Sequence, residues 1–99
     1  MRKTLNQPHT VIRQEMREAD GILYKYELTM RESFLVASYG MPLYSISVEM
    51  HSQNGELTTA KAVDTFSNPD KAILFFEKLA KNLATPIDLP YILEDEMSN

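Results

Sequence analysis

The sequence predicts an α+β domain: an antiparallel meander sheet of about four strands, with one long and one short C-terminal helix packed on one face. Three observations predict this class. Apolar and polar residues alternate along much of the chain before residue 67, which is the period of half-buried strands. Turn sequences that contain glycine separate the alternating stretches. After residue 67 the apolar spacing changes to three and four residues, the period of a helix.

Length and composition fit a single domain in a reducing compartment. The chain has 99 residues, of which 43% are hydrophobic, so it can bury a core of its own. We interpret residues 1–9 as a flexible tail and residues 10–97 as one domain. The chain has no cysteine, which excludes disulfides, thiolate zinc sites and cysteine nucleophiles. No signal peptide or membrane span is recognisable, so we expect a cytoplasmic protein without membrane contact.

The first hairpin is predicted over residues 10–31. In its first strand, Ile12 and Met16 are expected to face the core. The charged side chains of that strand are expected in solvent: Arg13, Glu15 and Arg17. Asp20 and Gly21 fit a tight turn because both accept positive backbone φ angles. The following strand alternates tyrosine and aliphatic residues with charged ones.

The second half of the sheet is predicted with one ambiguity. We interpret residues 34–51 as a kinked or bulged strand, and the sequence leaves open whether Gly40–Pro42 form a bulge or a true turn. Gln53–Gly55 give the strongest hairpin signal in the chain. The last strand is expected to continue to about Phe66.

Two helices are predicted after the sheet. For the first, Ser67 or Asn68 is the expected N-cap and Pro69 the first helical residue. Its apolar stripe is expected to comprise Ala72, Ile73, Phe75, Phe76, Leu79, Ala80 and Leu83. Pro86 separates it from a shorter helix, for which Asp88 is the expected N-cap.

The order of segments resembles a known group of proteins. A tyrosine-rich strand, the segment Ser38–Met41, an alternating strand, a helix after "AVDTFSNPD" and a terminal "TPIDLPYILED" resemble a small family of uncharacterised Firmicutes proteins of clostridial type, over roughly residues 22–96. Its terminal motif is matched here by Thr85, Pro86, Leu89, Glu94 and Asp95. The family position that is often histidine is Asp88 here. The resemblance implies fold and lineage, because the family has no established activity.

Charge and spacing argue against several functions. The net charge is −4 and the basic residues form no dense cluster, so no nucleic-acid partner is expected. The acidic residues 94–96 could suggest a cation site together with Asp88. Consecutive helical residues point about 100° apart, however, and cannot converge on one ion. We therefore expect no metal and no cofactor.

Glu49 and His51 form a second candidate site. Two residues apart on a strand, they project from one face together with Ser45 and Ser47. Such a row could perform acid–base chemistry or line a ligand pocket between sheet and helices. The simpler interpretation is the solvated face of an antiparallel sheet.

These patterns favour a non-enzymatic cytoplasmic interaction or regulatory module, whose partner is an unknown protein or a second copy of the chain. The candidate interaction residues are Asp88, Leu89, Tyr91, Glu94 and Asp95. The alternative is a small-molecule-binding protein or minor enzyme, with Glu49 and His51 as the candidate ligand face.

Overall fold

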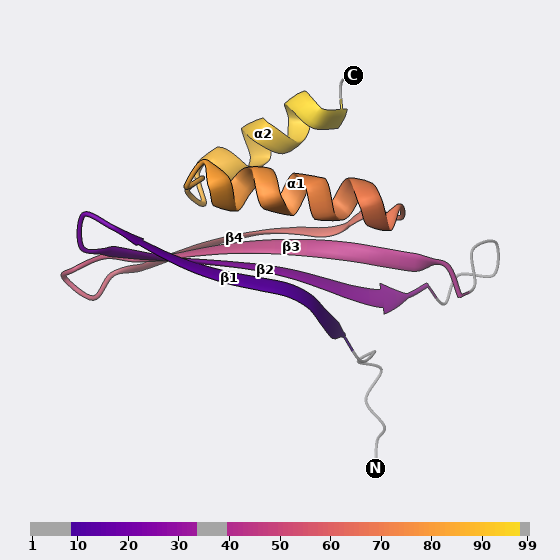
Figure 1. Ribbon diagram of the computed structural model, residues 1–99, viewed down its shortest axis with the longest axis horizontal. Coiled ribbons are helices and arrows are strands. Elements are labelled where there is room, and N and C mark those ends of the chain that lie inside the picture. The colour runs from indigo at the N-terminus through magenta and orange to yellow at the C-terminus, as the bar shows by residue number, and fades with distance from the viewer. Residues whose placement is uncertain (1–8, 34–39, 98–99) are drawn as a thin grey trace, which may run out of the picture.

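A computed structural model describes residues 9–33 and 40–97, so most of the predicted tail and residues 34–39 lie outside the described residues. Four strands form one antiparallel sheet in the order of the chain: β1 (Thr10–Ala19), β2 (Ile22–Glu32), β3 (Pro42–His51) and β4 (Leu57–Phe66). Two helices follow, α1 (Pro69–Lys81) and α2 (Asp88–Met97). Both lie on the same side of the sheet (Figure 1). The predicted α+β class and meander order are confirmed.

Both predicted hairpin turns are present. Between β1 and β2, Asp20 and Gly21 have φ angles of 54° and 77°, as the primed turn of a two-residue hairpin requires. Between β3 and β4, the Ser52 N–H donates to the Glu56 carbonyl at 2.9 Å. The two turns are also joined to each other, because Gln53 Nε2 donates to the Asp20 carbonyl at 3.2 Å.

Gly40 lies in a turn just before β3. β3 begins at Pro42, which pairs with Glu32, the last residue of β2. Ser33 N–H donates to the Met41 carbonyl at 2.8 Å, and Gly40 N–H donates to the Ser33 carbonyl at 2.9 Å. Gly40 has a φ angle of 82°, which favours glycine. The prediction of one kinked strand running through these residues is wrong.

The core lies between the helices and one face of the sheet. From β2 and β3 it takes the inward side chains of Tyr26, Leu28, Ile46 and Val48. α1 contributes Ala72, Phe75, Phe76, Leu79 and Ala80, the buried stripe that the helical spacing predicts. Tyr26 also makes a polar contact inside this core, since its hydroxyl donates to the Ala84 carbonyl at 2.8 Å. This bond fixes the segment between the helices to the centre of the sheet.

The facing of β1 differs from the prediction. Its register with β2 shifts between Val11 and Arg13, so a bulge at Ile12 reverses the facing of every later residue. Ile12 packs against the core as predicted, but Met16 is 56% exposed. Glu15 and Arg17, predicted to lie on the solvent side, stand opposite Tyr26 and Tyr24 and therefore face the helix layer.

α1 begins as predicted and ends earlier. Asn68 is the N-cap, and its side chain accepts a hydrogen bond from the Lys71 N–H at 3.0 Å. Pro69 occupies the first turn, where no intrahelical donor is needed. The helix ends at Lys81, and Leu83 has a φ angle of 51°. Leu83 lies beyond the helix end and is therefore not a member of the helical stripe, contrary to the prediction. Its side chain is half-buried.

Candidate interaction surface

Thr85 and Asp88 cap the start of α2 reciprocally. The Thr85 N–H donates to Asp88 Oδ2 at 3.0 Å, and the Asp88 N–H donates to Thr85 Oγ1 at 3.3 Å. This is a capping box in which Thr85 is the N-cap and Asp88 the third residue of the turn. The prediction that Asp88 itself is the N-cap is wrong, because its carboxylate reaches backward to Thr85. Asp88 therefore has a structural role.

Leu89, another candidate interaction residue, belongs to the core. Its side chain is only 2% exposed, and Ile92 and Leu93 pack against the same core from the next turn of the helix. α2 also contacts β4. Leu89 holds α2 to the domain and is not accessible to a partner in the folded protein.

The outward side of α2 carries apolar side chains in solvent. Ile87 is 69% exposed and Tyr91 is 70% exposed. Ile87 lies in the capped turn just before α2, and Tyr91 lies in the helix four residues later, the spacing that makes neighbours on a helix surface. Glu94 and Asp95 continue the same side one turn further on and are exposed. We call Ile87, Tyr91, Glu94 and Asp95 the outer face of α2.

This helix is strongly acidic. Its ten residues include Asp88, Glu94, Asp95 and Glu96, and its last turn contains no basic residue. Glu96 is matched by α1, since its Oε1 lies 3.6 Å from Lys78 Nζ. Negative charge at a helix C-terminus is opposed by the helix dipole. The acidic C-terminal end of α2 therefore interacts unfavourably with the dipole of its own helix.

Glu49 and His51 lie on the opposite side of the molecule. Val48 faces the helices, so the next residue on β3, Glu49, projects from the other face of the sheet, and so does His51 two residues later. His51 Nε2 lies 3.4 Å from Glu49 Oε1. Because they face away from the helices, these two residues line no pocket between sheet and helices. A hollow of about 320 Å³ on the same face is lined instead by residues that include Glu27, Thr29, Ser45, Ser47 and Lys61.

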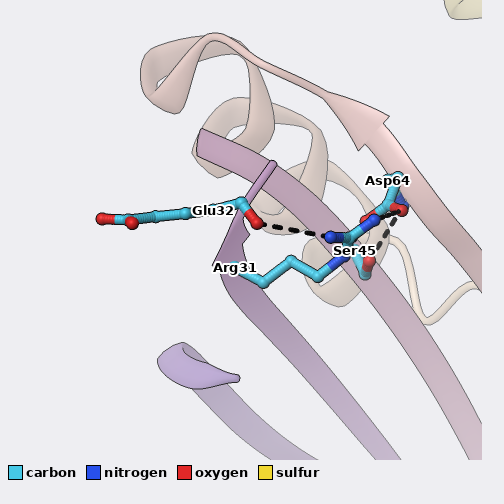
Figure 2. Close-up of polar contacts among 4 residues, drawn as sticks. All are labelled: Arg31, Glu32, Ser45 and Asp64. Carbon is cyan, nitrogen blue, oxygen red and sulfur yellow. Dashed lines mark hydrogen bonds and ion pairs between the residues drawn. The ribbon is translucent and has the colours of Figure 1, made fainter. Parts of the chain in front are cut away.

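The sequence did not predict an ion pair that crosses this face of the sheet. Arg31 from β2 reaches over β3 to Asp64 of β4, with Arg31 Nε donating to Asp64 Oδ1 at 3.1 Å and Nη2 donating to Oδ2 (Figure 2). The Asp64 N–H donates to Ser45 Oγ at 2.8 Å. Asp64 has a φ angle of 52° and lies in a register shift of β4. Three strands are thus fastened at one bulge.

The sequence does contain a signal for this bulge. Ala62 and Phe66 are both buried, and strict alternation would place Asp64 between them, facing the core. A carboxylate at an inward position indicates an irregular strand, because burying an isolated charge is very unfavourable. The position of its partner could not be read from the sequence, since Arg31 is 33 residues away.

Asp64→Asn is expected to lower the free energy of unfolding by about 1–3 kcal/mol, because it removes the charge of a two-bond ion pair that is mostly shielded from solvent. Asparagine retains the shape and tolerates positive φ, so the bulge itself is preserved. Urea denaturation measures the change. Glu49→Gln, which alters an exposed pair, is the control and should change stability by less than about 0.5 kcal/mol. Equal effects of the two substitutions would contradict this role of Asp64.

Two further findings concern the described part of the chain. Residues 9–33 and 40–97 contain no group of three or more histidine or acidic side chains placed to hold a metal ion. Neither α1 nor α2 is long and apolar enough to cross a membrane.

Comparison with known proteins gives one match. A family model described as a family of unknown function (DUF6514) matches residues 6–99. No curated protein and no solved structure matches the chain.

Proposed function

We propose a function for this chain, which belongs to the DUF6514 family of unknown function: a small, cytoplasmic, non-enzymatic interaction or regulatory module. It binds a protein partner through the outer face of α2 and forms a homodimer. The partner offers an apolar groove rimmed by lysine or arginine. The observation that carries this proposal is the exposure of two apolar side chains: Ile87, in the capped turn just before α2, and Tyr91, four residues later on this acidic helix.

The chemistry of the outer face of α2 supports a partner that binds it in a groove. Apolar anchors four residues apart on one side of a helix are the pattern by which amphipathic helices bind grooves. Tyrosine is among the residues that most often dominate binding energy. The net negative charge of α2 is complementary to a basic rim, which would increase the association rate and select the partner.

Replacing Tyr91 or Ile87 with alanine is expected to weaken partner binding at least about tenfold, as for a central interface anchor. The experiment captures partners from native cytoplasm with the full chain and with each variant. Point substitutions are preferable to removal of α2, which would also remove the buried Leu89. Leu74→Ala is the matched control, because Leu74 is an apolar residue of α1 with 66% exposure.

A photo-reactive phenylalanine analogue at position 91 identifies the surface that is bound. The proposal requires that the analogue cross-link a partner segment with apolar residues flanked by lysine or arginine, and that added salt weaken the complex. Equal capture by the wild type and by the Tyr91 and Ile87 variants would reject the outer face of α2 as the binding surface. Cross-linking that is equally strong from position 74 would reject it as well.

A further inference from the structure

The outer edge of β1 is an open backbone edge in the described part of the chain. β1 is first in the sheet order, so only its inner side is hydrogen-bonded to a described strand. None of its ten residues is buried, and it contains neither proline nor glycine. The bulge of β1 lies near its start, at Ile12, so the rest of the strand has a regular backbone edge that can pair with another strand.

The regular part of this edge is symmetric about Met16. The stretch from Arg13 to Ala19 keeps an unbroken register with β2, bounded by the bulge at Ile12 and the turn at Asp20. Met16 is its middle residue. A twofold axis at Met16 would pair the whole stretch with the same stretch of a second copy, running antiparallel. In this register even-numbered residues pair with even-numbered residues, and odd-numbered with odd-numbered. The backbone N–H and C=O groups that point away from β2 in one copy therefore face the same groups of the other copy.

The charges of this stretch select the same register. With the axis at Met16, Glu15 stands opposite the partner's Arg17, and Arg17 stands opposite the partner's Glu15. Within one protomer Arg17 Nη1 already lies 2.7 Å from Glu15 Oε2. The two ion pairs would therefore close into a ring of alternating charge.

Neighbouring registers are unfavourable. An axis at Glu15 or at Arg17 places that residue opposite its own copy, and like charges directly opposite each other destabilise strand pairing. An axis at Gln14 avoids this conflict but carries the pairing across the bulge at Ile12.

We infer that two copies of the chain pair through β1 about a twofold axis at Met16, which joins their sheets into one continuous sheet. Met16, exposed on the side away from the helices, then contacts the partner's Met16. This inference rests on the homodimer of the proposed function and specifies its interface. It is independent of the outer face of α2.

The other edge of the sheet offers no comparable match. The register shift near Asp64 restricts the regular part of β4 to Leu57–Ala62. Lys61 is the single charged residue in that stretch, so no register supplies it with an acidic counterpart from a second copy.

Cysteine cross-linking tests the axis directly, because the chain contains no cysteine. In Met16→Cys the two thiols lie on either side of the twofold axis. The Cα atoms of the two introduced cysteines would be about 4.5–5.5 Å apart, a separation that suits a disulfide. Mild oxidation of the full-length variant is expected to give a covalent dimer. Glu18→Cys is the control on the same strand and face, since its two copies are offset by about 13 Å along the strands. Its cross-linking should be at least about tenfold weaker.

Charge exchange provides the second measurement. Glu15→Arg, or Arg17→Glu, places like charges across the axis and should shift sedimentation from dimer to monomer. The double exchange Glu15→Arg with Arg17→Glu should restore the dimer. A circular dichroism spectrum like that of the wild type shows that each single variant retains the fold, as expected for side chains that are about 40% exposed.

The possible failures are distinguishable. A dimer that ignores the charge exchanges and cross-links no better at position 16 than at position 18 would overturn the β1 interface and leave the homodimer in place. A chain that stays monomeric from about 1 μM to about 1 mM, the range of weak protein affinities, would overturn both. Neither result bears on binding through α2.

Discussion

Leu89→Ala is expected to lower the free energy of unfolding by about 2–5 kcal/mol, the cost of removing a buried leucine and leaving a cavity. Leu89 is 2% exposed and is the most deeply buried residue of α2. Its loss removes the anchor that holds this helix against the core. Urea denaturation followed by circular dichroism measures the change, which would be a large fraction of a typical domain stability of about 5–15 kcal/mol.

Tyr91→Ala is the matched control for this prediction. It removes a larger side chain from the same helix two residues away, but Tyr91 is mostly in solvent. The expected change in stability is therefore within about 0.5 kcal/mol. Comparable losses for both substitutions, or for neither, would show that the division of α2 into a buried side and an outer face is incorrect.

Alkaline pH is expected to destabilise the protein through Tyr26. Burial, together with the nearby Tyr24, raises the pKa of the Tyr26 hydroxyl from 10.0 to about 12. Between these values the unfolded chain loses this proton while the folded chain keeps it, so unfolding becomes more favourable as the pH rises. The contribution of Tyr26 is fully present below pH 10. About 2–3 kcal/mol of stability should be lost as the pH rises from 10 to 12.

Tyr26→Phe separates this titration from that of the other groups. At neutral pH the substitution should cost about 1–2 kcal/mol, because the buried Ala84 carbonyl loses the donor that lies 2.8 Å away. Above pH 10, stability should fall less steeply than in the wild type. Denaturation curves collected at several pH values test both points. Parallel curves for the two proteins would contradict the assignment of the loss to Tyr26.

The elements that local chemistry determines were predictable from the sequence. Asp20-Gly21 and Gln53–Gly55 correctly located two turns because few residues accept the backbone angles that hairpin turns require. Asn68-Pro69 located the start of α1 for a similar reason. Alternation predicted the inward residues of β2 and β3, where no residue interrupts the period.

The failures have three causes: an extra residue in a strand, a contact distant in sequence, and a local ambiguity at the start of α2. At Ile12 a single unpaired residue reverses the facing of the rest of β1, and counting by two cannot detect it. At Asp64 the inward position of a carboxylate indicated an irregular strand, but the position of Arg31, which neutralises its charge, could not be predicted because Arg31 lies on another strand. Asp88 resembles an N-cap as much as it resembles the third residue of a capping box, and only the direction of its carboxylate decides between them.

The candidate surface was predictable in part. The terminal segment was predicted to be an interaction surface, and its candidate residues combined Leu89 with Tyr91. The structure separates them, because Leu89 is buried whereas Tyr91 is 70% exposed. Leu89, Ile92 and Leu93 have the spacing of one helix face and pack against the core together. Tyr91 lies outside that face.

The order of the strands also bears on how the chain folds. Every strand pairs with its neighbour in sequence, so each pairing closes a short loop and loses little chain entropy. The hydrogen bond from Tyr26 to Ala84 is different, because it links residues 58 positions apart. The loop-closure part of the entropic cost is therefore largest for the docking of the two helices. A meander with local contacts of this kind favours rapid folding, with helix docking as the step that unites the sheet and the C-terminal region.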